Sequence, residues 1–261
     1  MKSVLVTGAD GQLGQCLRKI SDDYPDMRFE FHNSKTLDIT KQGHLEAVFC
    51  DGRFDYCINC AAYTNVEQAE KTPHQAYKIN ARAVRLLARY CLDYQVTLIH
   101  ISTDYVFEGA NTTGYFPDDE TNPINVYGKS KLEGETHIQE LLERYVIIRT
   151  SWLYSEYGKN FYKTILQKAK LGDDLRINDE QTGCPTNANH LAVYVMDFID
   201  KGLTTYGIHH FTDGEAMTWY DFAKRILKEN NLEGKVRLEK ARNYRTLAKR
   251  PENSILLPRR R

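Results

Sequence analysis

A tyrosine and a lysine stand four residues apart in the segment "YGKSK", as Tyr127 and Lys131. If this segment opens a helix, both side chains lie on one face, because residues four apart are neighbours on an α-helix. A free tyrosine, with a pKa of about 10, is a slow acid near neutrality, but a nearby positive charge lowers that pKa. The pair is therefore suited to giving a proton to a reacting oxygen. The alternative is a helix-start tyrosine beside a solvated lysine.

Three glycines, Gly8, Gly11 and Gly14, follow the apolar segment "SVLVT" and lead into "QLGQCLRKIS". Glycines in such a turn let the backbone approach a pyrophosphate, which then sits at the N-terminus of the following helix. The order of strand, turn and helix predicts a dinucleotide site that includes Gln12 and Leu13. A glycine triplet without that context would indicate only a tight turn.

The elements around these motifs alternate along the first 150 residues. Apolar runs without strict alternation are typical of parallel strands covered on both faces, and they lie at 3–8, 28–33, 56–62, 96–102 and 145–151. Helical segments are expected at 11–21, 73–94 and 130–144. This alternation predicts an α/β fold, with a Rossmann-like doubly wound parallel sheet in a dinucleotide-binding domain over residues 1–150.

The pattern loosens after residue 150. Helices are expected at 160–172, 187–202 and 218–231, and a short strand at 208–212. Thr218 and Asp221 have the spacing of a capping box, with Asp in place of the usual Glu. Residues 151–261 are therefore expected to form mainly a smaller C-terminal substrate lobe over the carboxyl ends of the strands, where open α/β sheets bind ligands, with some segments returning to the Rossmann domain.

Composition excludes several classes of protein. Apolar residues make up 41% and charged residues 27% of the 261 residues, as in a globular protein rather than a disordered one. No apolar run is long enough to span a membrane, the N-terminus lacks the pattern of a signal peptide, and the zero net charge argues against a nucleic-acid partner.

Cysteine usage argues against a metal site. Cys57 and Cys60 lie three apart on an expected strand, so they point to opposite faces and one metal cannot easily take both. We interpret the six cysteines as small core residues in a reducing, cytoplasmic compartment. The basic segment 235–261 is either a solvated end or a surface for an anionic ligand.

The glycine spacing G-x-x-G-x-x-G and the segment Y-x-x-x-K resemble the extended branch of the short-chain dehydrogenase/reductase superfamily. That resemblance implies that Thr103, after "LIHIS", holds the substrate oxygen while Tyr127 supplies the proton. Lys131 would assist the phenol, and both Tyr127 and Lys131 would contact the nicotinamide side of the cofactor.

The cofactor expected from this resemblance is NADPH or NADH. The segments "LDIT" and "CAAYT" are similar to the adenine and nicotinamide-ribose segments of the superfamily, which implies contacts from Asp38, Ile39, Ala61, Ala62 and Tyr63. The second strand should end in "HNSK", without the acid that would select NAD by binding the ribose 2′-hydroxyl. NADPH is therefore predicted to bind at least comparably to NADH.

Longer segments resemble one family, the dTDP-4-dehydrorhamnose reductases. They are "STDYVFEG", "NPINVYGKSKLEGE", "RTSWLYSEYGKNF", "QTGCPT" and "RPENS", and the likeness runs from about residue 3 to 256. It implies reduction of the C4 ketone of dTDP-4-dehydro-L-rhamnose, the last step of dTDP-L-rhamnose synthesis. By the same likeness the sugar would be met by Thr64, Val66, Thr103, Asp104 and Trp152.

Three functions stay open at this point. Nucleotide-sugar dehydratases carry Asp-Glu after the catalytic Thr, whereas this chain has Asp104 and Tyr105, which disfavours dehydration. Another nucleotide-sugar reductase or epimerase is an alternative, and so is a non-catalytic NADP-binding regulatory subunit. The family usually continues with a further helix where this chain ends "LPRRR", which keeps the last alternative open. Some members use magnesium at a dimer contact, which leaves a homodimer open, but we assign no carboxylate cluster to a metal.

Overall fold

The computed structural model describes residues 1–242 and 245–259, so residues 243–244 and 260–261 of the basic segment lie outside the described residues. A six-stranded sheet with the order β10-β5-β4-β3-β1-β2 forms the centre, and every neighbouring pair is parallel. Its strands are β1 (Lys2–Thr7), β2 (Met27–His32), β3 (Tyr56–Asn59), β4 (Thr97–Thr103), β5 (Tyr145–Thr150) and β10 (Gly207–His210).

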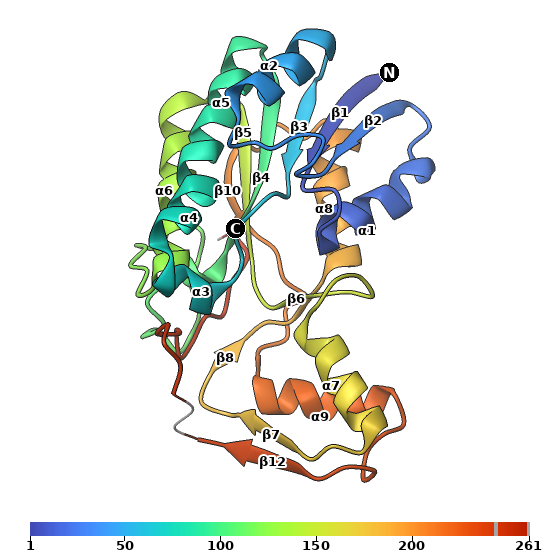
Figure 1. The fold of residues 1–261 in the computed structure, drawn as a ribbon, viewed down its shortest axis with the longest axis vertical. Coiled ribbons are helices and arrows are strands. Elements are labelled where there is room, and N and C mark those ends of the chain that lie inside the picture. Colours follow the sequence, from blue (N-terminus) through green and yellow to red (C-terminus); the bar gives the residue numbers. More distant parts are fainter. Residues whose placement is uncertain (243–244, 260–261) are drawn as a thin grey trace.

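The strand order reverses between β1 and β3. The chain leaves β1 for β2 on one side and then crosses to β3 on the other, so the loops after β1 and β3 separate at the carboxyl edge of the sheet. Such a switch point is where open α/β sheets bind their ligands. The carboxyl ends of the strands face the smaller lobe, which lies below the sheet in Figure 1.

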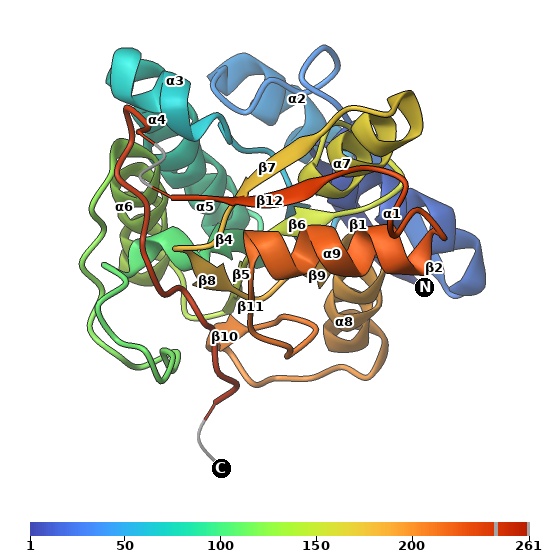
Figure 2. The ribbon, with the colours of Figure 1, turned by 90° about the horizontal axis from the view of Figure 1, so that it is seen from below.

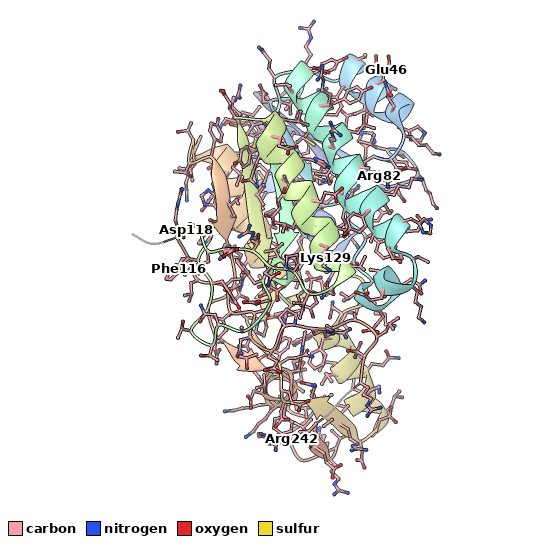
Figure 3. The ribbon with its side chains drawn as sticks, turned by 90° about the vertical axis from the view of Figure 1, so that its left-hand side faces the viewer. Glu46, Arg82, Phe116, Asp118, Lys129 and Arg242 are labelled. Carbon is pink, nitrogen blue, oxygen red and sulfur yellow. The ribbon has the colours of Figure 1, made fainter. Side chains whose placement is uncertain are left out.

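Helices cover both faces of this sheet, as the apolar runs predict. One face packs against α2 (Gln42–Asp51), α5 (Ala83–Asp93) and α6 (Val126–Leu141), and the other against α1 (Gln12–Ile20) and α8 (Ala188–Asp200). Figure 3 looks onto α5 and α6, with the exposed Glu46, Arg82 and Lys129 on the outer side. The doubly wound Rossmann-like fold is therefore confirmed.

The helical segment predicted at 73–94 is interrupted by a wider turn. It consists of α4 (Pro73–Tyr77), the π-helical turn η2 (Lys78–Arg82) and α5. The wider turn brings the backbone at Asn80 close to α6, since a Cβ atom on Gly134 would lie 2.1 Å from Asn80 O. The Asn80 side chain is buried, accepts a hydrogen bond from Tyr63 N at 2.8 Å and donates to Tyr63 O at 3.0 Å. It thereby holds the loop that follows β3.

The smaller lobe has an apolar core of its own between α7 (Phe161–Leu171), α9 (Trp219–Glu229) and the parallel pair β7 (Leu175–Asn178) and β12 (Leu238–Ala241). In Figure 2, seen from below, β7 and β12 run side by side across this lobe. The helix cap predicted at Thr218 is confirmed, because Thr218 Oγ1 accepts a hydrogen bond from Asp221 N at 3.1 Å. The Asp221 carboxylate accepts a bond from the Thr218 hydroxyl.

Short elements complete the chain, and α8 and β10 join the layers of the main sheet although they follow residue 150. The short elements are η1 (Ser21–Asp23), α3 (Val66–Lys71), η3 (Asp104–Val106), β6 (Leu153–Tyr154), β8 (Thr182–Gly183), β9 (Thr186–Asn187) and β11 (Met217–Thr218). Within residues 1–242 and 245–259, no helix is long and apolar enough to cross a membrane. The same residues contain no group of three or more His, Cys, Asp or Glu side chains placed to hold a metal ion.

Candidate active site

The turn between β1 and α1 is shaped by close backbone contacts. Gly8 has φ of +66°, and a Cβ atom there would lie 2.6 Å from Ala61 N. A Cβ atom on Gly14 would lie 2.6 Å from Gly8 O, so α1 presses directly onto the turn. The N-cap residue Gly11 has no side chain to satisfy the first backbone N–H groups of α1. These groups form a site for an anion such as a pyrophosphate.

Two adjoining cavities open around this turn, with volumes of about 460 and 290 Å³. They share Asp10, Gly11, Cys60 and Ala62 in their walls, so they form one crevice along the carboxyl edge of the sheet. Cys60 is therefore a wall residue of both cavities and Cys50 is exposed, so the prediction of core cysteines is wrong for these two. Burial raises the pKa of the Cys60 thiol.

Most of the residues predicted for the site line these two cavities. The larger cavity is lined by Gly11, Gln12, Leu13, Ala62, Thr64, Thr103, Asp104, Tyr127, Lys131 and Trp152. The smaller cavity is lined by Gly8, Gly11, Asp38, Ile39, Ala61 and Ala62. Three predicted residues, Gly14, Tyr63 and Val66, line neither cavity. Gly14 lies beneath the glycine turn, and Val66 begins α3.

The positions of Tyr127 and Lys131 in the "YGKSK" segment follow from how α6 begins. Asn125 caps the helix by accepting a hydrogen bond from Gly128 N at 2.8 Å. A Cβ atom on Gly128 would lie 2.1 Å from Tyr105 O, so only glycine lets the first turn come this close to the end of β4. Tyr127 and Lys131 then lie one turn apart along the larger cavity, and Thr103 ends β4 beside them.

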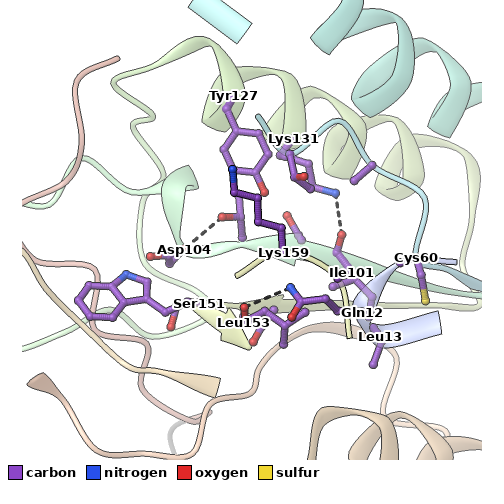
Figure 4. A pocket seen from close by; sticks show the side chains of 18 of the residues that line it. Gln12, Leu13, Cys60, Ile101, Asp104, Tyr127, Lys131, Ser151, Leu153 and Lys159 are labelled. Carbon is purple, nitrogen blue, oxygen red and sulfur yellow. Dashed lines mark hydrogen bonds between the residues drawn. The ribbon is translucent and has the colours of Figure 1, made fainter. Parts of the chain in front are cut away.

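The phenol of Tyr127 is held in its protonated form. Burial raises the pKa of Tyr127 to about 12, partly opposed by a hydrogen bond with Thr103. The prediction that Lys131 lowers this pKa is wrong for this structure, because the Lys131 ammonium group is directed elsewhere. Its Nζ donates to Ile101 O at 2.6 Å (Figure 4) and lies 3.2 Å from His100 Nε2.

A buried chain of hydrogen bonds explains the state of Lys131. Ala61 N–H donates to Asn59 Oδ1 at 3.2 Å, so the Asn59 amide nitrogen is the group that donates to His100 Nδ1 at 3.0 Å. A neutral histidine that accepts at Nδ1 carries its proton on Nε2, which faces Lys131. This proton opposes a positive charge on Lys131 Nζ, which lies 3.2 Å from His100 Nε2. Burial acts in the same direction and lowers the pKa of Lys131 to about 8.

Asp104 presents an unused acceptor inside the larger cavity. Its Oδ1 accepts a hydrogen bond from Thr103 Oγ1 at 3.0 Å, while its buried Oδ2 has no protein partner among the described residues. Burial raises the pKa of Asp104 to about 7, against the opposing effect of the nearby Ser254 and Thr103 hydroxyls. A buried oxygen of this kind is suited to a ligand hydroxyl.

A buried ion pair fixes α6 against the sheet behind the site. Arg149 on β5 donates to both carboxylate oxygens of Glu135 on α6, with the shortest contact 2.7 Å from Nη2. Ser102 on β4 donates to the same carboxylate at 2.5 Å. Glu135 is completely buried and Arg149 nearly so. The pair joins β5 to α6, which carries Tyr127 and Lys131, and Ser102 joins β4, which carries Thr103, to the same carboxylate.

Trp152 connects the larger cavity to the smaller lobe. Its backbone has φ of +47°, and its ring lies against Gly183, where a Cβ atom would be 2.6 Å from the ring. The ring stacks on Trp219 of α9, with centroids 3.5 Å apart. Trp219 in turn lines a third cavity of about 280 Å³ together with Phe161, Arg176 and Arg250.

No pattern in the sequence predicts this third cavity. In the sequence, Trp219 is indistinguishable from any apolar residue of an amphipathic helix. Arg176 lies on a strand of only four residues, which is too short to carry a pattern. Arg250 does lie in "RPENS", one of the segments with family resemblance, and this resemblance could have indicated that Arg250 belongs to the site. Its guanidinium group is held by Glu67 on α3, with Nη1 and Oε1 2.5 Å apart.

Comparison with known proteins gives consistent matches over nearly the whole chain. Residues 1–260 match a family model described as the RmlD substrate binding domain. A dTDP-4-dehydrorhamnose reductase of Aggregatibacter actinomycetemcomitans is 40% identical, over 98% of this chain and 90% of its own. One from Sinorhizobium fredii is 36% identical, over 96% and 87%. A crystal structure of dTDP-4-dehydrorhamnose reductase from Bacillus anthracis, in complex with NADP, has a TM-score of 0.93 and 36% identity, over 99% of this chain and 91% of that one.

Proposed function

The chain belongs to the RmlD substrate binding domain family, and we propose that it reduces the C4 ketone of dTDP-4-dehydro-L-rhamnose to dTDP-L-rhamnose with NADH or NADPH. One observation carries this proposal. Thr103, Tyr127 and Lys131 line a single cavity that continues into the cavity around the glycine turn. Ketone reduction needs a proton donor beside a nicotinamide site, and this crevice would provide both.

The residues of the crevice fit a nicotinamide dinucleotide. The close approach at Gly8 and the open N-terminus of α1 would hold the pyrophosphate, and Asp38 and Ile39 would meet the adenosine. When bound, the dihydronicotinamide supplies a hydride to the ketone carbon. Residues 1–150 would thus mainly bind the cofactor, and residues 151–261 would mainly bind the substrate.

Tyr127 is the proposed proton donor. With its pKa raised to about 12 it carries the proton throughout the neutral range, as the reductive direction requires. Thr103 would hold the substrate oxygen beside the phenol. Lys131, one helical turn away on the same cavity wall, would hold the nicotinamide ribose.

The substrate would extend from the larger cavity into the third. Asp104 Oδ2, buried without a protein partner among the described residues, would accept a sugar hydroxyl, and Thr64, Val66 and Trp152 would flank the sugar. In the third cavity the two guanidinium groups of Arg176 and Arg250 suit a diphosphate. The rings of Phe161 and Trp219 suit the face of a thymine base.

We also propose a cytoplasmic location and a homodimer. The six cysteine thiols are free, and four of them are buried, which fits a reducing compartment. The proposed assembly is testable by light scattering on the purified protein, which would report a single-chain mass if the homodimer is wrong.

Cofactor oxidation in the presence of dTDP-4-dehydro-L-rhamnose tests the proposed activity. We expect loss of NADH or NADPH absorbance that depends on the sugar nucleotide, and almost none with Tyr127→Phe, although this variant should still bind the nucleotide. Oxidation with other keto sugars alone would instead support a different reductase. A folded protein that binds the dinucleotide and turns over neither would support the regulatory-subunit alternative.

A further inference from the structure

The end of β2 bears on the choice between NADH and NADPH. In dinucleotide-binding folds an Asp or Glu near this point binds the ribose 2′-hydroxyl and selects NAD, and a 2′-phosphate needs a basic group instead. Here β2 ends at His32 and is followed by Asn33, Ser34 and Lys35. From the strand alone, therefore, nothing rejects a 2′-phosphate.

A carboxylate reaches this point from a different segment. Asp10, in the glycine turn, accepts a hydrogen bond at Oδ2 from Asn33 Nδ2, at 2.8 Å. The orientation of the Asn33 amide is set independently, because its Oδ1 accepts from Lys35 N at 2.9 Å and Thr36 N at 3.2 Å. The amide nitrogen therefore points to Asp10, and the Asp10 carboxylate is tethered beside the end of β2.

Asp10 and Asn33 both line the smaller cavity. No Lys or Arg is found among the described residues that line it, and its other acid, Asp38, has its Oδ1 engaged by Thr40 N and Oγ1 at 3.0 and 2.8 Å. Lys35 is exposed and contributes only its backbone N–H to the turn at Asn33. In the described part of the chain, the wall therefore carries two carboxylates and no basic side chain, and only Asp38 has a cation nearby, Lys41 Nζ at 3.9 Å from its Oδ2.

We propose that Asp10 makes this protein prefer NADH to NADPH. The carboxylate would accept a hydrogen bond from the ribose 2′-hydroxyl, and it would repel the 2′-phosphate, which carries about −1.5 to −2 charges at neutral pH. This role reverses the expectation from the end of β2. It rests on the proposed use of a nicotinamide nucleotide, but not on the identity of the sugar.

Calorimetric titration of the protein with NADH and with NADPH, without any sugar, tests this role. We expect NADH to bind at least about tenfold more tightly, a difference of about 1.4 kcal/mol. Asp10→Asn keeps the size of the side chain and can still pair with Asn33, so it should bring the two affinities to within about threefold, mainly by tightening NADPH. Glu30→Gln removes a charge from β2 at a residue outside the cavity wall and should leave the preference unchanged.

Equal affinities in the unaltered protein, or tighter binding of NADPH, would overturn the assignment. An unchanged preference in Asp10→Asn with NADH binding intact would also overturn it and would locate the selectivity in another residue. Since no sugar is present, either result leaves the proposed reduction standing. Absence of binding by both nucleotides would contradict the role of Asp10 and the proposed function together.

Discussion

Because Lys131 is buried, its amine should make the free energy of unfolding depend on pH, and a neutral side chain at this position should remove that dependence. Lys131 is 2% exposed, and burial lowers its pKa from 10.5 to about 8. The substitution Lys131→Met keeps a long flexible side chain and removes the titrating amine. We expect the variant to be nearly inactive, but its unfolding free energy carries the more specific information about the site.

The magnitude follows from the two pKa values. Below about pH 8 both folded and unfolded chains carry the proton, and the folded protein bears the full cost of a buried ammonium group. Between about pH 8 and 10.5 the folded amine releases its proton while the unfolded one retains it, so stability rises with pH. At about 1.4 kcal/mol for each pH unit, the unaltered protein should gain about 3 kcal/mol relative to Lys131→Met between pH 7 and 10.5.

Other effects of the substitution do not depend on pH in this way. Loss of the Lys131 amine leaves Ile101 O without its hydrogen-bond donor and His100 without its neighbour. This costs about 1–3 kcal/mol, but the cost is the same at every pH. Urea unfolding of both proteins at several pH values from 7 to 10 isolates the difference. Lys129→Met, at an exposed position of the same helix, is the control and should parallel the unaltered protein. A constant difference between Lys131→Met and the unaltered protein would refute the buried-amine reasoning.

Three further variants test separate parts of the site. Tyr127→Phe should lower kcat at least about a hundredfold with an unchanged nucleotide Kd by calorimetry, and more than about a tenth of the rate remaining would contradict its role as acid. Glu135→Gln should lower the free energy of unfolding in urea by about 3 kcal/mol, because Arg149 is left buried without its counter-charge. A loss below about 1 kcal/mol would contradict a stabilising role for this ion pair. Arg176→Ala should raise KM for the sugar nucleotide about tenfold or more, as expected for a lost charged hydrogen bond to phosphate, with little change in kcat. An unchanged KM would place the diphosphate elsewhere than beside Arg176 and Trp219.

The main sheet and its helices were predictable because each is long enough to carry a pattern. The uninterrupted apolar runs at β1, β4 and β5 are typical of parallel strands that are buried on both faces. Two-residue strands such as β6 and β9 carry no such pattern, since they exist only through pairing with distant segments. The turn of π-helix at η2 is likewise absent from the periodicity, because it depends on the contact of Asn80 with Gly134.

The site was predictable where its residues lie in one short segment. Tyr127 and Lys131 follow from the spacing on one helix, but the direction of the Lys131 amine depends on His100 and Ile101 of β4. The Asp10–Asn33 contact joins two loops 23 positions apart. No local rule predicts such a contact, so the expectation for the cofactor from the end of β2 could not take Asp10 into account.

The type of reaction also depends on Tyr105, which stands where nucleotide-sugar dehydratases carry a glutamate. Its ring meets the Tyr127 ring edge to face, with centroids 5.8 Å apart, and burial raises the pKa of its phenol. Tyr105 lines none of the three cavities, so it is not placed to protonate a departing hydroxyl. We therefore expect the unaltered protein to remove no water from dTDP-glucose.

Mass spectrometry of the sugar nucleotide tests the proposed reduction most directly. With dTDP-4-dehydro-L-rhamnose and NADH, we predict a product heavier by two hydrogen atoms, formed in equal amount to the NADH consumed. With dTDP-glucose we predict no change in mass. A dTDP-glucose product lighter by one water molecule, or a keto sugar unchanged in mass while the folded protein binds NADH, would contradict the assignment of this chain as a reductase.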